Sequence, residues 1–158
     1  MKTLGFLMTI FGFVFFASLA YGMNGTTVEM LNKDAEGNRM VYSQEIVEIE
    51  VGQIVKWIPT DKGHNVEIIA APEGFEIPKK SKNSKEVEMQ FDIPGVYYYW
   101  CTPHKGMGMI GLVVVGGDIS NIDDIASAKA MGKSKKKLKA LLEAVSYTHL
   151  TLPTILLV

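Results

Sequence analysis

Residues 96–115 read VYYYWCTPHKGMGMIGLVVV, and this stretch decides the fold. Its first six residues, Val96–Cys101, are aromatic and β-branched, which is typical of a strand. Its last seven, Met109–Val115, are almost wholly apolar, so we expect a second buried strand there. The glycine-containing residues between them, 102–108, then form a loop that joins two core strands.

Cys101, the only cysteine of the chain, directly precedes this loop, which contains His104 and Met107, and Met109 directly follows it. A thiolate and imidazole nitrogens arranged trigonally, with a weak axial methionine, are the ligands of a blue-copper electron-transfer site. Met109 is the better axial candidate because it directly precedes the strand. Met107 could instead pack on the His104 ring or lie on the surface. The loop therefore predicts part of a copper site.

A blue-copper site needs a second histidine, and His64 is the candidate upstream. It lies where the loop 61–63 meets a β-prone segment, Val66–Ile69, so it is expected at a loop-to-strand junction. The amide of Asn65 could tie this loop to the one that holds Cys101. We treat His149 as a non-ligand because it belongs to an atypical C-terminal segment.

Other readings of these residues are less favoured. A lone cysteine near an apolar strand is most often an inert buried thiol, but two histidines and a methionine at the ends of neighbouring strands make coincidence a poor explanation. A thiol nucleophile with a general base is disfavoured because no Asp or Glu accompanies the turn to orient His104. Zinc is disfavoured because thioethers are poor zinc ligands.

The rest of the chain predicts a β-sandwich followed by helices. Short β-prone segments with turns between them are expected at residues 28–31, 46–51, 54–58, 66–69 and 87–91. From Asp118 the apolar period becomes helical, and Lys133–Val145 places leucines on one stripe with lysines opposite. We therefore expect an all-β, Greek-key sandwich of seven to eight strands with two C-terminal α-helices.

The chain begins with the pattern of a secretory signal peptide. Lys2 gives a positive start, Leu4–Ala20 is apolar and uncharged, and small residues follow. We expect residues 1–22 to be removed, with cleavage after Ala20 or Gly22; an uncleaved membrane anchor is the alternative. Export to an oxidising compartment would leave the single thiol without an internal partner, and a bound metal would occupy it.

We expect one domain, residues 23–117, with the helical segment 118–145 packed on it. The last residues, 146–158, read SYTHLTLPTILLV, carry no formal charge and contain a helix-breaking Pro153. They resemble neither a linker nor a finished C-terminus, so they are left out of the fold prediction as possibly non-native. The alternative is a short apolar tail that docks on the domain.

Charge gives no sign of nucleic-acid binding. Of the 16 Lys and Arg residues one, Lys2, lies in the signal-like segment, which leaves 15 basic against 17 acidic side chains, a net charge of about −2. Electrostatic recognition of a partner must therefore come from local patches.

With these residues in hand, the chain resembles the pseudoazurins, type 1 copper proteins of the bacterial periplasm. The resemblance covers residues 28–145 and rests on several short motifs. They are Met30-Leu31-Asn32-Lys33 with Glu36-Gly37, Asp61-Lys62-Gly63-His64-Asn65-Val66-Glu67, Pro94-Gly95, Cys101-Thr102-Pro103-His104 with Met107-Gly108-Met109, Asn121-Ile122-Asp123 and Ser127-Ala128-Lys129.

The resemblance implies a cupredoxin sandwich that holds one copper ion through His64, Cys101, His104 and Met109. It also implies an electron carrier rather than an enzyme, with a copper nitrite reductase or a cytochrome c as its redox partner. Docking in that family uses an apolar patch around the exposed copper histidine, ringed by lysines. Here that ring could include Lys33, Lys62 and some of Lys79, Lys80 and Lys82.

Two departures from the family fall beside the ligands. Trp100 stands where the family often has lysine, and Lys105-Gly106 replaces a more usual aromatic and small residue. The docking surface is therefore expected to be altered here, with Trp100 among the residues that a partner reads. The alternative function is a periplasmic copper carrier or storage module without a redox partner, although no Met-rich or His-rich tail supports it.

Overall fold

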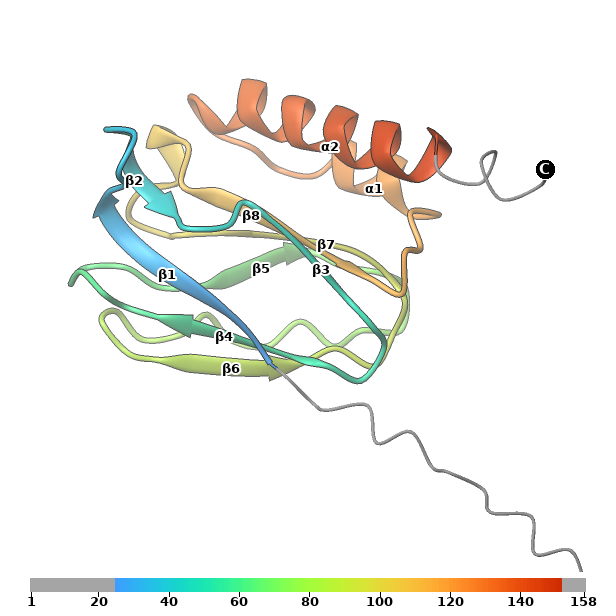
Figure 1. Cartoon of the computed structure of the whole chain (residues 1–158), viewed down its shortest axis with the longest axis horizontal. Helices are drawn as coiled ribbons and strands as arrows, with labels where there is room; N and C mark the ends of the chain where they lie inside the picture. Colours follow the sequence, from blue (N-terminus) through green and yellow to red (C-terminus); the bar gives the residue numbers. More distant parts are fainter. Residues whose placement is uncertain (1–24, 152–158) are drawn as a thin grey trace, which may run out of the picture.

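The computed structural model describes residues 25–151, in which two sheets are stacked face to face and two helices lie across the outer face of one of them (Figure 1). The signal-like segment and the end of the apolar tail lie outside the described residues. The strands are β1 (Thr26–Lys33), β2 (Arg39–Tyr42), β3 (Ile46–Ile49), β4 (Ile54–Ile58), β5 (Glu67–Ala70), β6 (Val87–Gln90), β7 (Gly95–Trp100) and β8 (Ile110–Val115). The helices are the 3₁₀ turn η1 (Lys105–Met107), α1 (Ile122–Ala126) and α2 (Ser134–Thr151).

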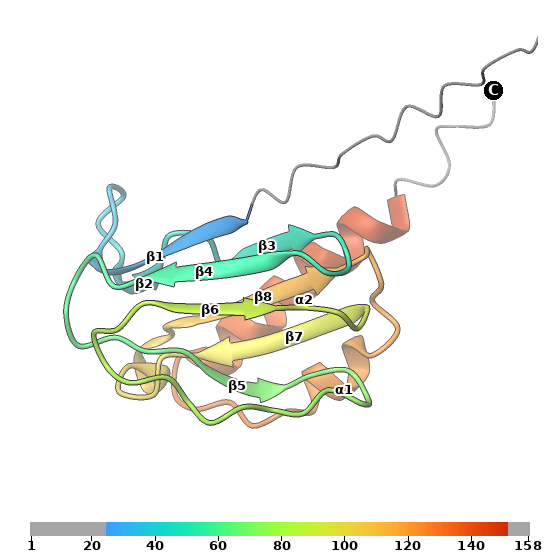
Figure 2. The same cartoon turned by 90° about the horizontal axis from the view of Figure 1, so that it is seen from below.

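Each sheet has four strands, in the orders β2-β1-β4-β6 and β3-β8-β7-β5. Both sheets are mixed, because β1 runs parallel to β4 and β3 runs parallel to β8, while the other pairs are antiparallel. Figure 2 shows the two layers from the side of β6, with the helices behind β7 and β8. The eight-stranded Greek-key cupredoxin sandwich with two C-terminal helices is thereby confirmed.

The second sheet is buried on both faces, and β7 shows how. Tyr97, Tyr99 and Cys101 belong to the core between the sheets, whereas Tyr98 and Trp100 belong to the core between this sheet and the helices. Successive side chains of a strand point to opposite faces, so an unbroken apolar run is what a strand with two covered faces requires. This explains why both β7 and β8 lack polar residues.

The helices pack on the second sheet through the stripe predicted for residues 133–145. Leu138, Leu142 and Val145 are buried there with Ile125 of α1. The last helix was expected within residues 118–145, whereas α2 continues through Thr151 and so includes the first residues of the segment 146–158 that was left out of the fold prediction. Within this extension the Ser146 hydroxyl donates to the Leu142 carbonyl at 2.9 Å. None of the helices within residues 25–151 is long and apolar enough to cross a membrane.

Strand β2 was not among the strands predicted. Its four residues, Arg39–Tyr42, do not alternate in polarity, and Met40 has a positive φ of 54°. Pairing with β1 forms the strand, with Met30 opposite Tyr42, and buries Val41 and Tyr42. Tertiary contacts rather than local pattern therefore specify this element.

Candidate metal centre

The predicted ligands come from two loops at one end of the sandwich, the loop before β5 and the loop between β7 and β8. His64 precedes β5, Cys101 follows β7 directly, and Met109 directly precedes β8. The three strands β5, β7 and β8 are neighbours, so their ends bring these residues together. The Cys101 N–H donates to the Met109 carbonyl at 3.0 Å, which continues the β7–β8 ladder into the turn.

The turn from Cys101 to Met109 is held by its own backbone. The His104 N–H donates to the Cys101 carbonyl at 3.0 Å, and the Met107 N–H donates to the His104 carbonyl at 2.9 Å. Gly108 then reverses the chain with a φ of 100°, a left-handed conformation that a residue with a side chain rarely adopts. The reversal closes the turn, so that His104 lies beside Cys101.

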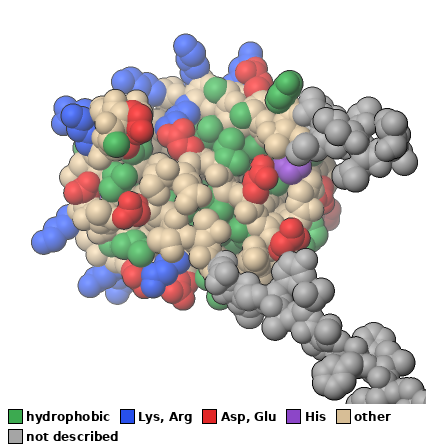
Figure 3. Space-filling view, in the orientation of Figure 1, with side chains coloured by type: hydrophobic (Ala, Val, Ile, Leu, Met, Phe, Trp, Pro, Cys, Tyr) green, Lys and Arg blue, Asp and Glu red, His purple; other side chains and the backbone are tan. Residues whose placement is uncertain are grey.

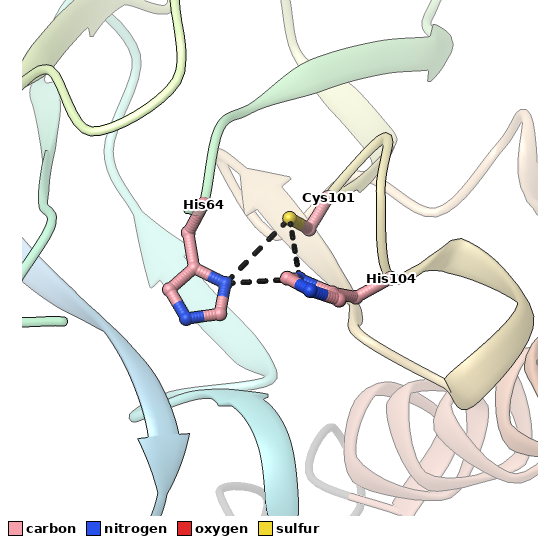
Figure 4. A group of neighbouring side chains, drawn as sticks. All are labelled: His64, Cys101 and His104. Carbon is pink, nitrogen blue, oxygen red and sulfur yellow. Dashed lines mark hydrogen bonds between the residues drawn. The ribbon is translucent and has the colours of Figure 1, made fainter. Parts of the chain in front are cut away.

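Three donor atoms converge in this end of the molecule (Figure 4). The two Nδ1 atoms of His64 and His104 are 3.1 Å apart, and the Cys101 Sγ lies 3.7 Å from the first and 3.4 Å from the second. Metal bonds of about 2.0 Å to nitrogen and about 2.3 Å to sulfur place such donors roughly 3 to 4 Å apart. The spacing therefore fits one metal ion bound between the three side chains.

The fourth predicted ligand, Met109, is fully buried and belongs to the same core as Cys101. Met107 is 48% exposed, so it is a surface residue of η1 rather than a buried neighbour of the thiol. A buried thioether added to two imidazoles and a thiolate is the donor set that copper takes in blue-copper sites.

Burial keeps the two imidazoles uncharged. It lowers the pKa of His64, which the neighbouring His104 lowers further against an opposing effect of Asp61. Burial also lowers the pKa of His104. Neutral imidazole is the form that binds a metal. Both rings are thus in their ligating form at neutral pH.

Burial has the opposite effect on the thiol. It raises the pKa of Cys101, partly opposed by hydrogen bonds from the backbone of Asn65 and His104. A nucleophilic cysteine needs a lowered pKa, and no Asp or Glu of residues 25–151 joins the cluster formed by Cys101 and the two histidines. These observations agree with a metal ligand and disfavour the thiol nucleophile.

Asn65 joins the two ligand loops, as predicted. Its Oδ1 accepts from the Thr102 N–H at 2.8 Å, and its Nδ2 donates to the Thr102 hydroxyl at 3.0 Å. Its carbonyl accepts from the Tyr42 hydroxyl at 2.8 Å. The residue after His64 is therefore fixed to the residue after Cys101 and to β2.

Three residues that support the site were given no role in the sequence analysis, although Asn32 and Glu67 lie in motifs quoted there. Asn32, at the end of β1, places its Oδ1 3.0 Å from His64 Nε2, which leaves Nδ1 to face Cys101. Glu67 accepts hydrogen bonds from both neighbours of Cys101. Ser134, at the start of α2, is buried and donates to the Lys105 carbonyl. Each is distant in sequence from its partner, so only the fold reveals it.

The structure corrects the expectation that a partner protein contacts Trp100. Its side chain is 3% exposed, because it faces the helices, and the Lys105 ammonium lies 4.7 Å from its ring centre. Lys105 is partly exposed and Gly106 is exposed. A partner at this turn would therefore meet Lys105, with the indole beneath it.

The predicted lysines are exposed. Lys33, Lys62, Lys79 and Lys80 all have exposed side chains, as does Lys82. Figure 3 shows Lys and Arg side chains around the end of the sandwich where the β1–β2 turn and η1 lie, with others over α2.

The chain is similar in sequence to copper binding proteins of one family. The profile of the copper binding proteins of the plastocyanin/azurin family matches residues 28–116. The pseudoazurin of Paracoccus pantotrophus is 42% identical over 121 residues, which cover 75% of this chain and 82% of that protein.

Two solved structures are similar to the whole body of the chain. The pseudoazurin of Methylobacterium extorquens AM1 superposes with a TM-score of 0.71 at 37% identity and covers 77% of this chain and 99% of its own. The native pseudoazurin of Hyphomicrobium denitrificans superposes with a TM-score of 0.70 at 43% identity, covering 76% and 97%.

Proposed function

Since the chain belongs to the copper-binding plastocyanin/azurin family, and within it to the pseudoazurins, we propose that it shuttles single electrons in the periplasm to a denitrification enzyme such as a copper nitrite reductase. As a member of this family, the chain is a cupredoxin electron-transfer protein with a copper cofactor. Pseudoazurins are electron carriers rather than enzymes. The observation that carries the proposal is the convergence of His64 Nδ1, His104 Nδ1 and Cys101 Sγ within 3.7 Å of one another.

The proposed ligands are His64, Cys101 and His104, with Met109 as the weak axial ligand. Bound copper would supply the redox chemistry by alternating between Cu(I) and Cu(II). The protein holds the donor atoms in nearly one arrangement for both states, because the ligand loops are fixed by hydrogen bonds such as those of Asn65. Small rearrangement between states is what rapid electron transfer requires.

His104 is the proposed exit for the electron. His64 is fully buried, whereas His104 is only partly buried on the exposed turn that also carries Pro103 and Met107. Its ring is therefore the ligand edge closest to a docked protein. The exposed Met107 would contribute to an apolar patch around it.

Exposed lysines would steer an acidic partner to this end of the molecule. Lys33, Lys62 and Lys80 carry the charge, and attraction of this kind raises the association rate and weakens as salt screens it. Periplasmic location is supported by the family and by the signal-like pattern of residues 1–22, which lie outside the described residues.

The partner is tested by stopped-flow oxidation of the reduced protein with a copper nitrite reductase. We expect second-order kinetics that slow as salt rises, and a slower reaction for Lys62→Glu. Lys139→Glu is the matched control, since Lys139 is an exposed lysine of helix α2 rather than of the ligand loops. No electron transfer at any salt concentration would contradict this partner. Rapid metal loss with slow electron self-exchange would instead favour the copper carrier.

A further inference from the structure

One carboxylate oxygen contacts both neighbours of Cys101. Glu67 begins β5 and lies directly opposite Trp100 of β7. Its Oε2 accepts a hydrogen bond from the Trp100 indole Nε1–H at 2.6 Å and from the Thr102 hydroxyl at 2.7 Å. The residues before and after Cys101 are thus tied to the same atom on the adjacent strand.

The hydrogen bonds to Glu67 lie on the side of strand β7 opposite to the Cys101 thiol. Cys101 belongs to the core between the two sheets, whereas Trp100 belongs to the core under the helices. Glu67 therefore constrains the backbone on both sides of Cys101 without lying among the ligand atoms. This arrangement fixes where the cysteine side chain begins and leaves its sulfur available to a metal.

The carboxylate is suited to this role because it stays charged. Burial raises the pKa of Glu67, but the hydrogen bonds from Trp100 and Thr102 and the charges of Lys105 and Lys80 outweigh it, so that the pKa is lowered overall. Hydrogen bonds to an ionised acceptor are shorter and stronger than neutral ones, in keeping with the two short contacts here.

The same network reaches the neighbours of the other two ligands. Thr102 is hydrogen bonded to Asn65, which follows His64. Trp100 lies beneath Lys105, which follows His104. Each of the three convergent ligands therefore has an adjacent residue in a network centred on Glu67.

We propose that Glu67 is a positioning residue that braces Cys101 through Trp100 and Thr102 and so holds the thiolate in place during electron transfer. The proposal rests on the proposed copper electron-transfer function. It also gives the buried Trp100 a structural role inside the molecule.

The test compares Glu67→Ala with Glu67→Gln in the copper protein. Glu67→Ala removes the acceptor, and we expect a changed ratio of the thiolate-to-copper absorption bands and electron self-exchange slowed about tenfold, as for other supporting residues of metal ligands. Glu67→Gln keeps an acceptor oxygen, so it should restore most of the rate. Glu88→Gln is the charge control, because Glu88 pairs with Lys56 in the other sheet.

A second readout needs no metal. The chain has two tryptophans, so the metal-free protein should give two indole N–H signals in a ¹H–¹⁵N spectrum, and Trp100→Phe assigns one of them. We expect the Trp100 proton to be displaced downfield and to move upfield in Glu67→Ala. Thr102→Val supplies the test if Glu67→Ala does not fold, with the same change of band ratio expected. It removes the donor to Glu67 and one acceptor of the Asn65 amide, which keeps its bonds to the Thr102 N–H and the Ser81 carbonyl.

An unchanged band ratio and exchange rate in Glu67→Ala, or in Thr102→Val if the first does not fold, would overturn the proposal. So would equal effects of Glu67→Ala and the charge control Glu88→Gln, since those would reflect the loss of one negative charge alone. A wild-type protein without any thiolate-to-copper band would instead contradict the proposed function, so the two failures are distinguishable.

Discussion

At the scale of single residues, His64 shows how one ring is shared between the metal site and the scaffold. Its Nδ1 faces the other donors, and its Nε2 lies 3.0 Å from Asn32 Oδ1. A carbonyl oxygen accepts from a ring N–H, so this contact selects the tautomer that leaves Nδ1 free for a metal. Asn32 belongs to β1, and its backbone N–H donates to the Asp61 carboxylate oxygen Oδ2 at 2.6 Å.

Replacing Asn32 with Ala should weaken copper binding. Loss of a partner that orients a ligating histidine lowers metal affinity by about 10-fold to 100-fold in other proteins, and we expect a decrease of at least about 10-fold. Competition with a chelator of known affinity measures it. Asn38→Ala is the control, because the Asn38 amide donates to the exposed Asp34 carboxylate within the β1–β2 turn. Equal affinities of Asn32→Ala and the wild type would show that Asn32 does not orient the ring.

At the scale of elements, the start of α2 supports the ligand turn. The Lys133 N–H donates to the Gly106 carbonyl at 3.0 Å, and the buried Ser134 hydroxyl donates to the Lys105 carbonyl. Gly132, with a φ of 55°, approaches so closely that a Cβ there would lie 2.4 Å from the Gly106 oxygen. Helix α2 therefore holds η1 in addition to covering the sheet.

Replacing Ser134 with Ala should destabilise the metal-free protein. The Lys105 carbonyl would lose its hydrogen bond in a buried place, which costs about 1 to 3 kcal/mol. Urea unfolding followed by circular dichroism measures the change. Ser120→Ala removes a hydroxyl from an exposed serine and should leave stability nearly unchanged. If the two variants were equally stable, the contact between α2 and η1 would contribute nothing.

The elements differ in how well the sequence predicts them. Strands β7 and β8 were predicted within one residue at each end, because a strand with two covered faces is continuously apolar. β2 was missed because its four residues show no period and its pairing with β1 defines it. The last turn of α2 was missed because Pro153 and the apolar tail suggested an earlier end, whereas the helix reaches Thr151.

At the scale of the whole molecule, the sandwich brings three ligand-bearing strand ends together. The sequence alone predicted His64, Cys101 and His104 as partners, since few residues of these types exist in the chain and all lie in loops that flank core strands. Asn32, Glu67 and Ser134 were not predicted, because common polar residue types do not indicate a partner, and their partners lie 29 or more positions away. The burial of Trp100 depends on which face of β7 the helices cover, and this face could not be told from the sequence.

The resemblance to pseudoazurins is confirmed by the comparisons.

Removing residues 146–158 should have little effect on stability. The buried stripe of α2 ends at Val145, and Tyr147 is 73% exposed. The His149 ring, 18% exposed, lies 3.4 Å from the carboxylate of Glu48, which is 51% exposed and so largely screened by water. Such pairs contribute about 0 to 1 kcal/mol, so we expect the melting temperature to fall by no more than about 4 °C. Leu142→Ala in the full chain is the positive control, with an expected loss of about 2 to 5 kcal/mol. A melting temperature lowered as much as in Leu142→Ala would show that the segment belongs to the folded body.

The most direct test of the copper assignment is the visible absorption of the protein reconstituted with Cu(II), measured beside Cys101→Ser. We expect an intense thiolate-to-copper band that ascorbate bleaches and reoxidation restores. We also expect no such band in Cys101→Ser, which should keep the wild-type circular dichroism because a hydroxyl replaces a buried thiol of similar shape. A wild-type protein that binds copper without this band, or a Cys101→Ser protein that keeps it, would contradict the account.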